Sequence, residues 1–208
     1  EGKSFVSLNT AASISLNGDK TILLEFDLRK PRLSRALGIN RQIGLSNYLA
    51  GQVNVEDIIQ PVEGFKDLFL IPSGPIPPNP AEIINSPRFD TLMDYLKLNY
   101  QFVLFDSPPV SAVTDAKLLA RAAHATIYIV RQNYTHISFI QLIKDLHIKK
   151  NLPNINIVFN GIKMRRGGGY GYGYGYGYNY RYGYNEDDHK DSMWKKIANK
   201  IRSVFQRQ

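Results

Sequence analysis

The chain has 208 residues, a formal net charge of +8 and no cysteine. Without cysteine, disulfide bonds and thiolate metal sites are excluded, and no apolar run approaches the roughly 20 residues of a membrane-spanning helix. We therefore expect a soluble α/β domain of roughly 150–170 residues with an appendage. The positive charge favours an anionic partner, such as nucleotide phosphates, acidic headgroups or nucleic acid, without choosing among them.

Short apolar runs alternate with helical patterns along most of the chain. An apolar-periodic helix is expected over residues 5–16, a helix or a pair broken near Pro87 over 81–98, and another helix over 138–149. Because strands and helices alternate, we predict an α/β fold with a mostly parallel sheet flanked by helices on both faces. In such sheets, ligands bind beyond the carboxyl ends of the strands. The predicted strands are residues 21–26, 69–72, 101–106, 125–130 and 154–162.

A Gly/Tyr-rich segment follows the Arg-Arg-Gly-Gly-Gly boundary at residues 165–169. Glycine adds backbone entropy and buries no side chain, so this segment cannot build a core. We interpret it as a flexible tail that presents phenol groups to solvent. The expected organisation is a domain over 1–165, the tail over 166–185 and a basic amphipathic helix over 186–208. The tail tyrosines are Tyr170, Tyr172, Tyr174, Tyr176, Tyr178, Tyr180, Tyr182 and Tyr184.

The last segment combines an apolar helical stripe with lysines and arginines on its other face. Two interpretations remain open. The helix lies on the cytoplasmic face of a membrane, with Trp194 and Phe205 inserted and the lysines on headgroups, or it docks on its own domain or on a partner. The stripe consists of Met193, Trp194, Ile197, Ala198, Ile201, Val204 and Phe205.

The start of the first helix carries the end of a phosphate-binding motif, G-x-x-x-x-G-K-[ST]. Gly2 would let the backbone approach the phosphates, Lys3 would reach the β and γ oxygens, and Ser4 would ligate Mg²⁺ at the helix N-terminus. The tripeptide alone is a weak signal, because it occurs often by chance. The alternative is a solvated N-terminal stub.

Acidic residues end two of the predicted strands. Glu25 and Asp27 stand at alternate positions and therefore point to the same side, as a Mg²⁺-water shell or a base would require. Asp106 follows four apolar residues and precedes the rigid Pro108-Pro109 turn, which is the Walker B arrangement of a metal-holding carboxylate. The alternative for each strand is an end that merely carries solvated charge.

Together these segments resemble the bacterial tyrosine kinases over about residues 1–165. This family regulates capsular and exopolysaccharide assembly, and it belongs to the deviant-Walker P-loop ATPases, relatives of the MinD/ParA group. The resemblance implies an ATP-dependent protein-tyrosine kinase that phosphorylates its own tyrosine cluster, with ATP and Mg²⁺ as cofactors. The matching segments are Gly2-Lys3-Ser4, ILLEFDLRKPRL, PSGPIPPNPAEII, FVLFDSPPV and Thr114-Asp115-Ala116.

The resemblance also implies roles for individual residues. Lys3 and Ser4 match the Walker A lysine and metal ligand, and Asp106 matches the metal-holding Walker B acid. Asp27 and Arg29 match the second acid and the arginine of the family's Asp-x-Asp-x-Arg motif, where the acid holds metal and takes part in catalysis.

Two further residues match the family's site less directly. Glu25 stands where the family usually has aspartate, and its extra methylene displaces the carboxylate by about 1.5 Å. It would act as a base or orient the attacking group. Asn160 would lie near the adenine, or else it forms an Asn-Gly turn.

Parts of the family pattern are missing from this sequence: the first half of the phosphate loop, the upstream acidic motif, two membrane helices and a periplasmic domain. The resemblance therefore implies the C-terminal part of a longer protein, on the cytoplasmic face of the bacterial inner membrane. These 208 residues are expected to bind ATP poorly, because the missing loop amides would cradle the phosphates.

The family's partners would be further copies of the chain, in a ring where one subunit's tail enters the next subunit's site. Polysaccharide assembly proteins, a tyrosine phosphatase and a membrane surface would also be partners.

Other function classes remain open. A ParA/MinD-like partitioning ATPase shares the fold and chemistry, although partitioning requires neither the PPNPAEI segment nor the tyrosines. A nucleic-acid module is disfavoured because the tyrosine run holds one arginine, Arg181, so no nucleic-acid partner is expected. The histidines lack metal-ligand spacing and are interpreted as structural or solvated. They are His124, His136, His147 and His189.

Overall fold

The structure is a computed structural model, and it describes residues 1–110 and 115–162. Residues 1–161 form one compact unit. The predicted tail, with its eight tyrosines, and the predicted C-terminal helix lie outside the described residues. Among the described residues, no helix is both long enough and apolar enough to cross a bilayer.

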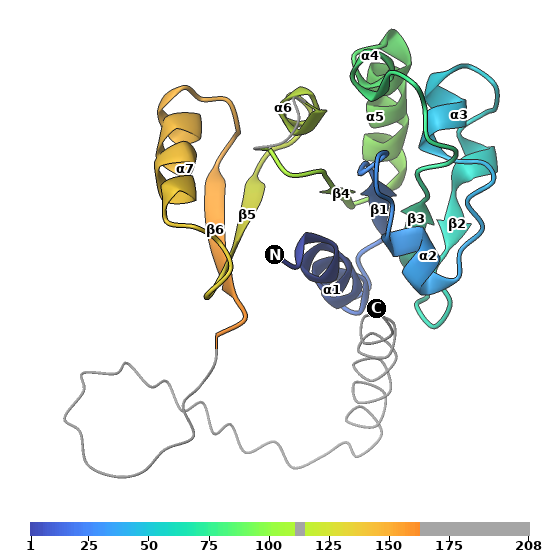
Figure 1. Cartoon of the computed structure of the whole chain (residues 1–208). Helices are drawn as coiled ribbons and strands as arrows, with labels where there is room; N and C mark the ends of the chain where they lie inside the picture. The colour runs from blue at the N-terminus through green and yellow to red at the C-terminus, as the bar shows by residue number, and fades with distance from the viewer. Residues whose placement is uncertain (111–114, 163–208) are drawn as a thin grey trace, which may run out of the picture. The chain divides into compact units, whose positions relative to one another are not determined.

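The strands form two hydrogen-bonded sheets (Figure 1). The first has the order β2-β3-β1-β4, in which β1 runs parallel to β3 and β4, and β2 runs antiparallel to β3. The second pairs β5 and β6 in parallel. The strands are β1 (Thr21–Glu25), β2 (Gln60–Pro61), β3 (Leu68–Ile71), β4 (Phe102–Asp106), β5 (Thr126–Arg131) and β6 (Ile155–Asn160).

The predicted α/β class, its mostly parallel strands and its flanking helices are confirmed. Among the described residues, β4 and β5 are not hydrogen-bonded to each other. The two-residue strand β2 was not predicted. It is short and polar, and only its antiparallel pairing with β3 makes it a strand.

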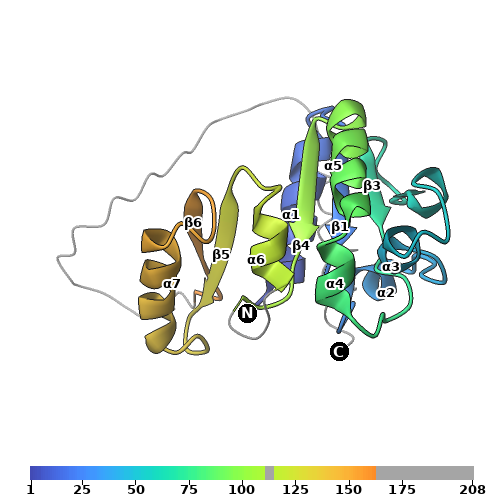
Figure 2. The same ribbon diagram turned by 90° about the horizontal axis from the view of Figure 1, so that it is seen from above.

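Helices cover both faces of the first sheet: α1 packs on β1 and β4, and α5 contacts β4 from the opposite side (Figures 1 and 2). Residues 81–98 belong to two helices, and Pro87 begins the second one. Proline is tolerated there because the backbone N–H of a first helical residue has no intrahelical acceptor, so its absence costs no hydrogen bond. The helices are α1 (Lys3–Ser15), α2 (Leu33–Leu37), α3 (Leu45–Leu49), a 3₁₀ turn (Glu56–Ile58), α4 (Pro80–Ile84), α5 (Pro87–Asn99), α6 (Asp115–Ala120) and α7 (Ser138–Ile148).

The core holds the carboxyl ends of β1 and β4 level with each other. All five residues of β1 are buried. Phe26, directly after β1, packs against Phe89 of α5 and Phe105 of β4, with ring centroids 5.8 and 5.4 Å apart. In the parallel register Glu25 lies opposite Asp106. The fold therefore places the two acidic strand ends predicted from the sequence side by side.

Candidate functional site

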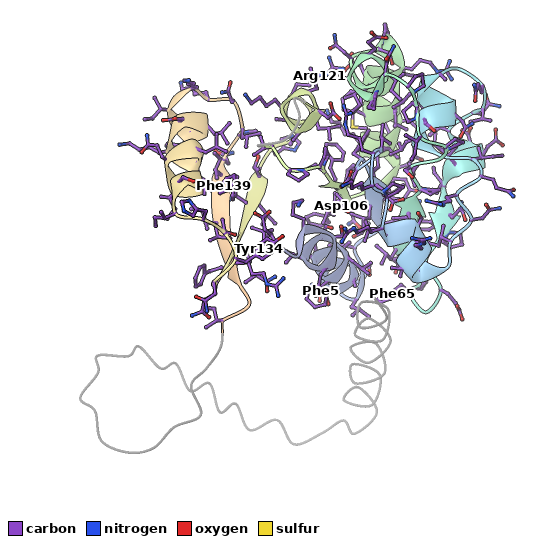
Figure 3. The ribbon with its side chains drawn as sticks, in the orientation of Figure 1. Phe5, Phe65, Asp106, Arg121, Tyr134 and Phe139 are labelled. Atoms are coloured by element: carbon purple, nitrogen blue, oxygen red, sulfur yellow. The ribbon has the colours of Figure 1, made fainter. Side chains whose placement is uncertain are left out.

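The candidate site lies where the carboxyl ends of β1 and β4 meet the N-terminus of α1. Helix α1 begins at Lys3, so Ser4 and Ser7 stand in its first two turns. Residues three apart on a helix share a face, and here that face meets Asp106 at the end of β4 (Figure 3). The structure thus brings together Ser4 and Asp106, which the sequence placed about one hundred residues apart.

Asp106 is a buried carboxylate surrounded by hydroxyl donors and other acids. The Ser7 hydroxyl donates to its Oδ1 at 3.2 Å, and Ser4 also donates to the carboxylate. Burial raises the pKa of Asp106 to about 6, assisted by the charges of Glu25 and Asp27 and opposed by the two hydroxyls. Negative charge is therefore costly here, and a cation would relieve that cost.

Positive charge gathers around the N-terminal residues. Lys3 Nζ lies 3.8 Å from Glu1 Oε2. The charges of Lys3, Arg131 and Arg32 all act on the first residue of the chain, Glu1. Arg32 and Arg131 were not among the site residues predicted from the sequence. For Arg131 a signal was available, because it ends β5, and carboxyl strand ends form the ligand edge of such sheets.

Gly2 and Asn160 lie in contact at the start of α1. Gly2 has a φ of +96°, in the left-handed region, and a Cβ there would collide with the Asn160 side-chain amide. Asn160 Nδ2 donates to the Glu1 carbonyl at 3.0 Å, and its Oδ1 accepts the Gly161 N–H at 2.8 Å. The Asn160 side chain thus links the end of β6 to the turn before α1, and it also accepts a hydrogen bond from the adjacent Gly161.

Glu25 is fully buried, and both of its carboxylate oxygens are engaged. It accepts hydrogen bonds from the Ser34 N–H at 3.2 Å, the Ser34 hydroxyl at 2.7 Å and the Ser73 N–H at 3.2 Å. Neither serine was predicted from the sequence. These bonds connect the end of β1 to helix α2 and to the proline-rich loop after β3.

Asp27 and Arg29 extend from the same strand end in different environments. Asp27 is half-buried, and its Oδ1 accepts the Lys30 N–H at 3.1 Å. Arg29 Nε donates to Asp115 Oδ2 at 3.2 Å, at the start of α6. Asp115 is buried, and its other oxygen has no hydrogen-bond partner among the described residues. Arg29 is therefore directed toward α6, whereas Asp27 remains accessible.

The donor set fits a magnesium nucleotide. No group of three or more acids or histidines in residues 1–110 and 115–162 could hold a metal ion by itself. Mg²⁺ in nucleotide sites commonly takes one or two protein ligands and completes its shell with phosphate oxygens and water. The Ser4 hydroxyl and the Asp106 carboxylate provide such ligands. Lys3 and the close backbone approach at Gly2 suit the phosphates.

Comparisons with known proteins point to the same chemistry. A family model described as an AAA domain matches residues 1–159. The tyrosine-protein kinase Wzc of Salmonella typhimurium is 34% identical over 169 residues, which are 81% of this chain and 23% of Wzc. YwqD, a tyrosine-protein kinase of Bacillus subtilis, is 32% identical over 170 residues, or 82% of this chain and 71% of YwqD. The chain therefore spans less than a quarter of Wzc and most of YwqD.

Solved structures agree. The kinase domain of the Escherichia coli tyrosine kinase ETK matches with a TM-score of 0.74 at 30% identity, covering 83% of this chain and 68% of that one. The chimerical protein CapA2B2 matches with a TM-score of 0.71 at 34% identity, and the match covers 78% of this chain and 72% of that one. MinD of Pyrococcus horikoshii shares the fold. Its TM-score is 0.59 at 24% identity, and the match covers 74% of this chain and 62% of that one. The chain belongs to the AAA-domain family and, within it, to the bacterial tyrosine-protein kinases.

Proposed function

We propose that the chain is the catalytic domain of an ATP-dependent tyrosine kinase that phosphorylates its own tail. The observation that carries this proposal is the meeting of the Ser4 and Ser7 hydroxyls with the buried Asp106 carboxylate at the start of α1. A hydroxyl and a carboxylate beside a glycine-lysine turn are the protein ligands of a Mg²⁺-nucleotide site. Relatives named tyrosine-protein kinases support the reaction class.

The residues divide between holding the nucleotide and orienting the acceptor. Ser4 and Asp106 would hold Mg²⁺, with Asp27 close by, and Lys3 would bind the phosphates with help from Arg32 and Arg131. When bound, MgATP supplies the phosphoryl group and neutralises charge as that group transfers. Gly2 keeps the backbone close to the phosphates. The neighbouring Asn160 would border the nucleotide from the end of β6.

A tyrosine hydroxyl has a pKa near 10, so a carboxylate should accept or orient its proton during transfer. Both carboxylate oxygens of Glu25 accept hydrogen bonds from Ser34 and Ser73. In Asp27, by contrast, one oxygen accepts the Lys30 N–H. This difference supports Asp27 as the proton acceptor. Glu25 would instead position helix α2 and the loop after β3, to which it is hydrogen-bonded. Arg29, bonded to Asp115, would position α6 beside the site.

The tail supplies the acceptors. Tyrosines 170–184 could be offered in turn, by one subunit to the site of the next within a ring. Each phosphate adds roughly −1.5 to −2 charges, so successive transfers should loosen the ring. A variant with all eight tail tyrosines changed to phenylalanine should stay assembled under conditions where the phosphorylated parent dissociates. Its dissociation would contradict this part of the proposal.

The names of the relatives support a setting for this domain in polysaccharide production. We propose that the domain works on the cytoplasmic face of the bacterial inner membrane, as the C-terminal part of a longer kinase in capsular or exopolysaccharide production. A relative in Klebsiella pneumoniae is described as a putative tyrosine-protein kinase in the cps region. The partners would be the polysaccharide machinery and a phosphatase. The basic C-terminal segment would contact the membrane or dock on protein.

A partitioning ATPase is the second candidate, because the fold is also that of MinD. The deciding experiment is phosphotyrosine mass spectrometry on the full-length protein beside an Asp106→Asn variant. Phosphate on tyrosines 170–184 in the parent and its absence from the variant would establish the kinase. An unmodified tail with intact ATP hydrolysis would instead favour the partitioning-type ATPase.

A further inference from the structure

A basic surface adjoins the candidate site around helix α2. Residues 28–55 contain five lysines and arginines and no acid. All five of these side chains are exposed. Within residues 1–110 and 115–162 only Arg29 among them has an ion pair, with Asp115. The other four cations are therefore available to an anionic partner. We call them the basic patch: Lys30, Arg32, Arg35 and Arg41.

The basic patch begins directly beside the proposed proton acceptor. The Lys30 N–H donates to Asp27 Oδ1 at 3.1 Å, so the turn that carries the Lys30 side chain is closed on Asp27. Helix α2, which carries Arg35, is fixed to the end of β1, because the Ser34 hydroxyl donates to the buried Glu25 carboxylate at 2.7 Å. These bonds hold the patch in one position at the edge of the sheet where a phosphoryl acceptor would enter.

We propose that the basic patch docks the acidic triplet Glu186-Asp187-Asp188 from the tail of a second copy of the chain. This inference rests on the proposed function, because it names what orients the acceptor tyrosines. The triplet begins two positions after Tyr184, the last tyrosine of the sequence. Two extended residues span at most about 7 Å. A docked triplet would therefore keep the last tyrosines of the tail close to Asp27.

Charge complementarity selects this triplet as the occupant. The sequence has no acid between Asp145 and Glu186, so the triplet is the first anionic group after the kinase domain. The patch would repel the cations of the tail and attract the triplet, which sets the direction in which the tail enters. A lipid surface on the same patch would instead cover the edge where the acceptor enters. The cations of residues 163–185 are Lys163, Arg165, Arg166 and Arg181.

The order of phosphorylation follows from this docking. Tyr182 and Tyr184 lie within four positions of Glu186, whereas Tyr170 precedes it by 16 positions. The effective concentration of a tethered group falls as its tether lengthens. The tyrosines next to the triplet should therefore be modified first, and Tyr170 should be modified late.

Peptide binding tests the docking separately from phosphoryl transfer. The probe is a fluorescent peptide of residues 180–188, and the receptor is the full-length protein without ATP. In the receptor, the tail tyrosines are changed to phenylalanine and the triplet is neutralised, so that the receptor's own tail does not compete with the probe. The neutralising substitutions are Glu186→Gln, Asp187→Asn and Asp188→Asn.

We expect Lys30→Glu/Arg35→Glu to weaken binding of the peptide about fivefold at low salt. The difference should fade as salt screens the charges. Lys66→Glu/Lys97→Glu is the matched control, because these two exposed lysines precede β3 and β4, at the amino ends of those strands. The control makes the same change in net charge and should leave binding unchanged.

Reversing the charges on both partners provides a rescue test. A peptide with Glu186→Lys and Asp187→Lys should bind the Lys30→Glu/Arg35→Glu receptor about fivefold more tightly than the receptor with an unchanged patch. Equal affinity of both receptors for both peptides would overturn the proposal. A patch variant that loses binding to phosphatidylglycerol vesicles but keeps its affinity for the peptide would also overturn it, because the partner would then be a membrane.

Mass spectrometry at early times separates this inference from the proposed kinase activity. In the full-length protein with its tyrosines intact, neutralising the triplet should remove the lead of Tyr182 and Tyr184 over Tyr170 and leave ATP hydrolysis unchanged. Full phosphorylation in an unchanged order would overturn the docking and leave the kinase intact. An unphosphorylated tail, together with charge-dependent peptide binding, would support the docking and contradict the kinase.

Discussion

The hydroxyl of Ser7 donates a 3.2 Å hydrogen bond to Oδ1 of Asp106, which lies 99 positions later in the chain. The carbonyls of Lys3 and Ser4, within the first turns of α1, lie 3.1 and 3.2 Å from the same hydroxyl oxygen and are alternative acceptors for its one proton. One side chain thus links the lysine-serine turn to the acid at the end of β4. Because Ser4 donates to the same carboxylate, the helix start and the acidic strand end act as one unit.

The stability of the unliganded protein should depend on pH through Asp106. Its pKa rises from 3.8 to about 6 on folding, chiefly through burial. The folded state therefore keeps this proton at a pH where the unfolded chain has lost it. The resulting stabilisation is complete below pH 4 and is lost as the pH rises through about 6, by about 3 kcal/mol at about 1.4 kcal/mol per pKa unit. Urea unfolding from pH 4 to 7.5 measures this loss.

Asp106→Asn is the control for that dependence, because asparagine cannot ionise and can still accept from Ser7. The variant should match the parent in stability at pH 4 and exceed it at pH 7.5 by about the same 3 kcal/mol. A parent and variant whose stabilities stay parallel across this range would contradict the raised pKa. In the full-length protein the variant should lose phosphorylation activity, because it lacks the charge that holds the metal.

Ser7→Ala should raise the pKa of Asp106 further. The Ser7 hydroxyl stabilises the charged carboxylate, and a hydrogen bond to a charged group contributes about 1.5–3 kcal/mol. The midpoint of the pH-dependent stability loss should therefore move up by roughly one pH unit. Ser15→Ala is the matched control, because Ser15 is in the same helix and its hydroxyl donates to the Ala12 carbonyl. Carboxyl NMR titration provides an independent readout.

Substitutions of Glu25 and Asp27 should have different effects: the first should mainly lower stability and the second should mainly lower catalytic activity. Glu25→Gln puts an N–H₂ group where Ser34 or Ser73 now donates to an oxygen, so it should destabilise the fold by about 1–3 kcal/mol. Asp27→Asn disturbs one exposed hydrogen bond from the Lys30 N–H and should change stability by less than about 0.5 kcal/mol. In the full-length kinase, however, Asp27→Asn should lower kcat more strongly. Equal stability losses in the two variants would contradict this division.

Gly2→Ala should weaken nucleotide binding in the full-length protein at least tenfold. Gly2 has a φ of +96°, and a Cβ would displace the Asn160 amide that holds the Glu1 carbonyl. Gly18→Ala is the matched control: its φ is +90°, but a Cβ there meets nothing within 4 Å. Both variants carry the left-handed strain of about 1–2 kcal/mol, and only Gly2→Ala should change the dissociation constant in a fluorescent-nucleotide titration. A similar loss in Gly18→Ala would make strain alone the cause.

Several features could be predicted from the sequence because they depend on local patterns. The apolar run around Leu23 predicted a buried parallel strand and the run around Leu104 predicted a further strand, and α1 and α7 followed from helical periodicity. The short helices α2, α3 and α6 have five or six residues and were not predicted, because isolated helices of that length are marginal without tertiary packing.

The sequence by itself determined the α/β class, the order of the strands along the chain and the family, because hydrophobic period and motif spacing are properties of neighbouring residues. Only the tertiary structure decided which partners the acidic residues have. Glu25 and Asp27 are two positions apart, yet Ser34 and Ser73 enclose Glu25 while Asp27 stays accessible. Burial and long-range hydrogen bonds set the pKa of Asp106 and the surroundings of Glu25, and both arise only when segments distant in sequence pack together.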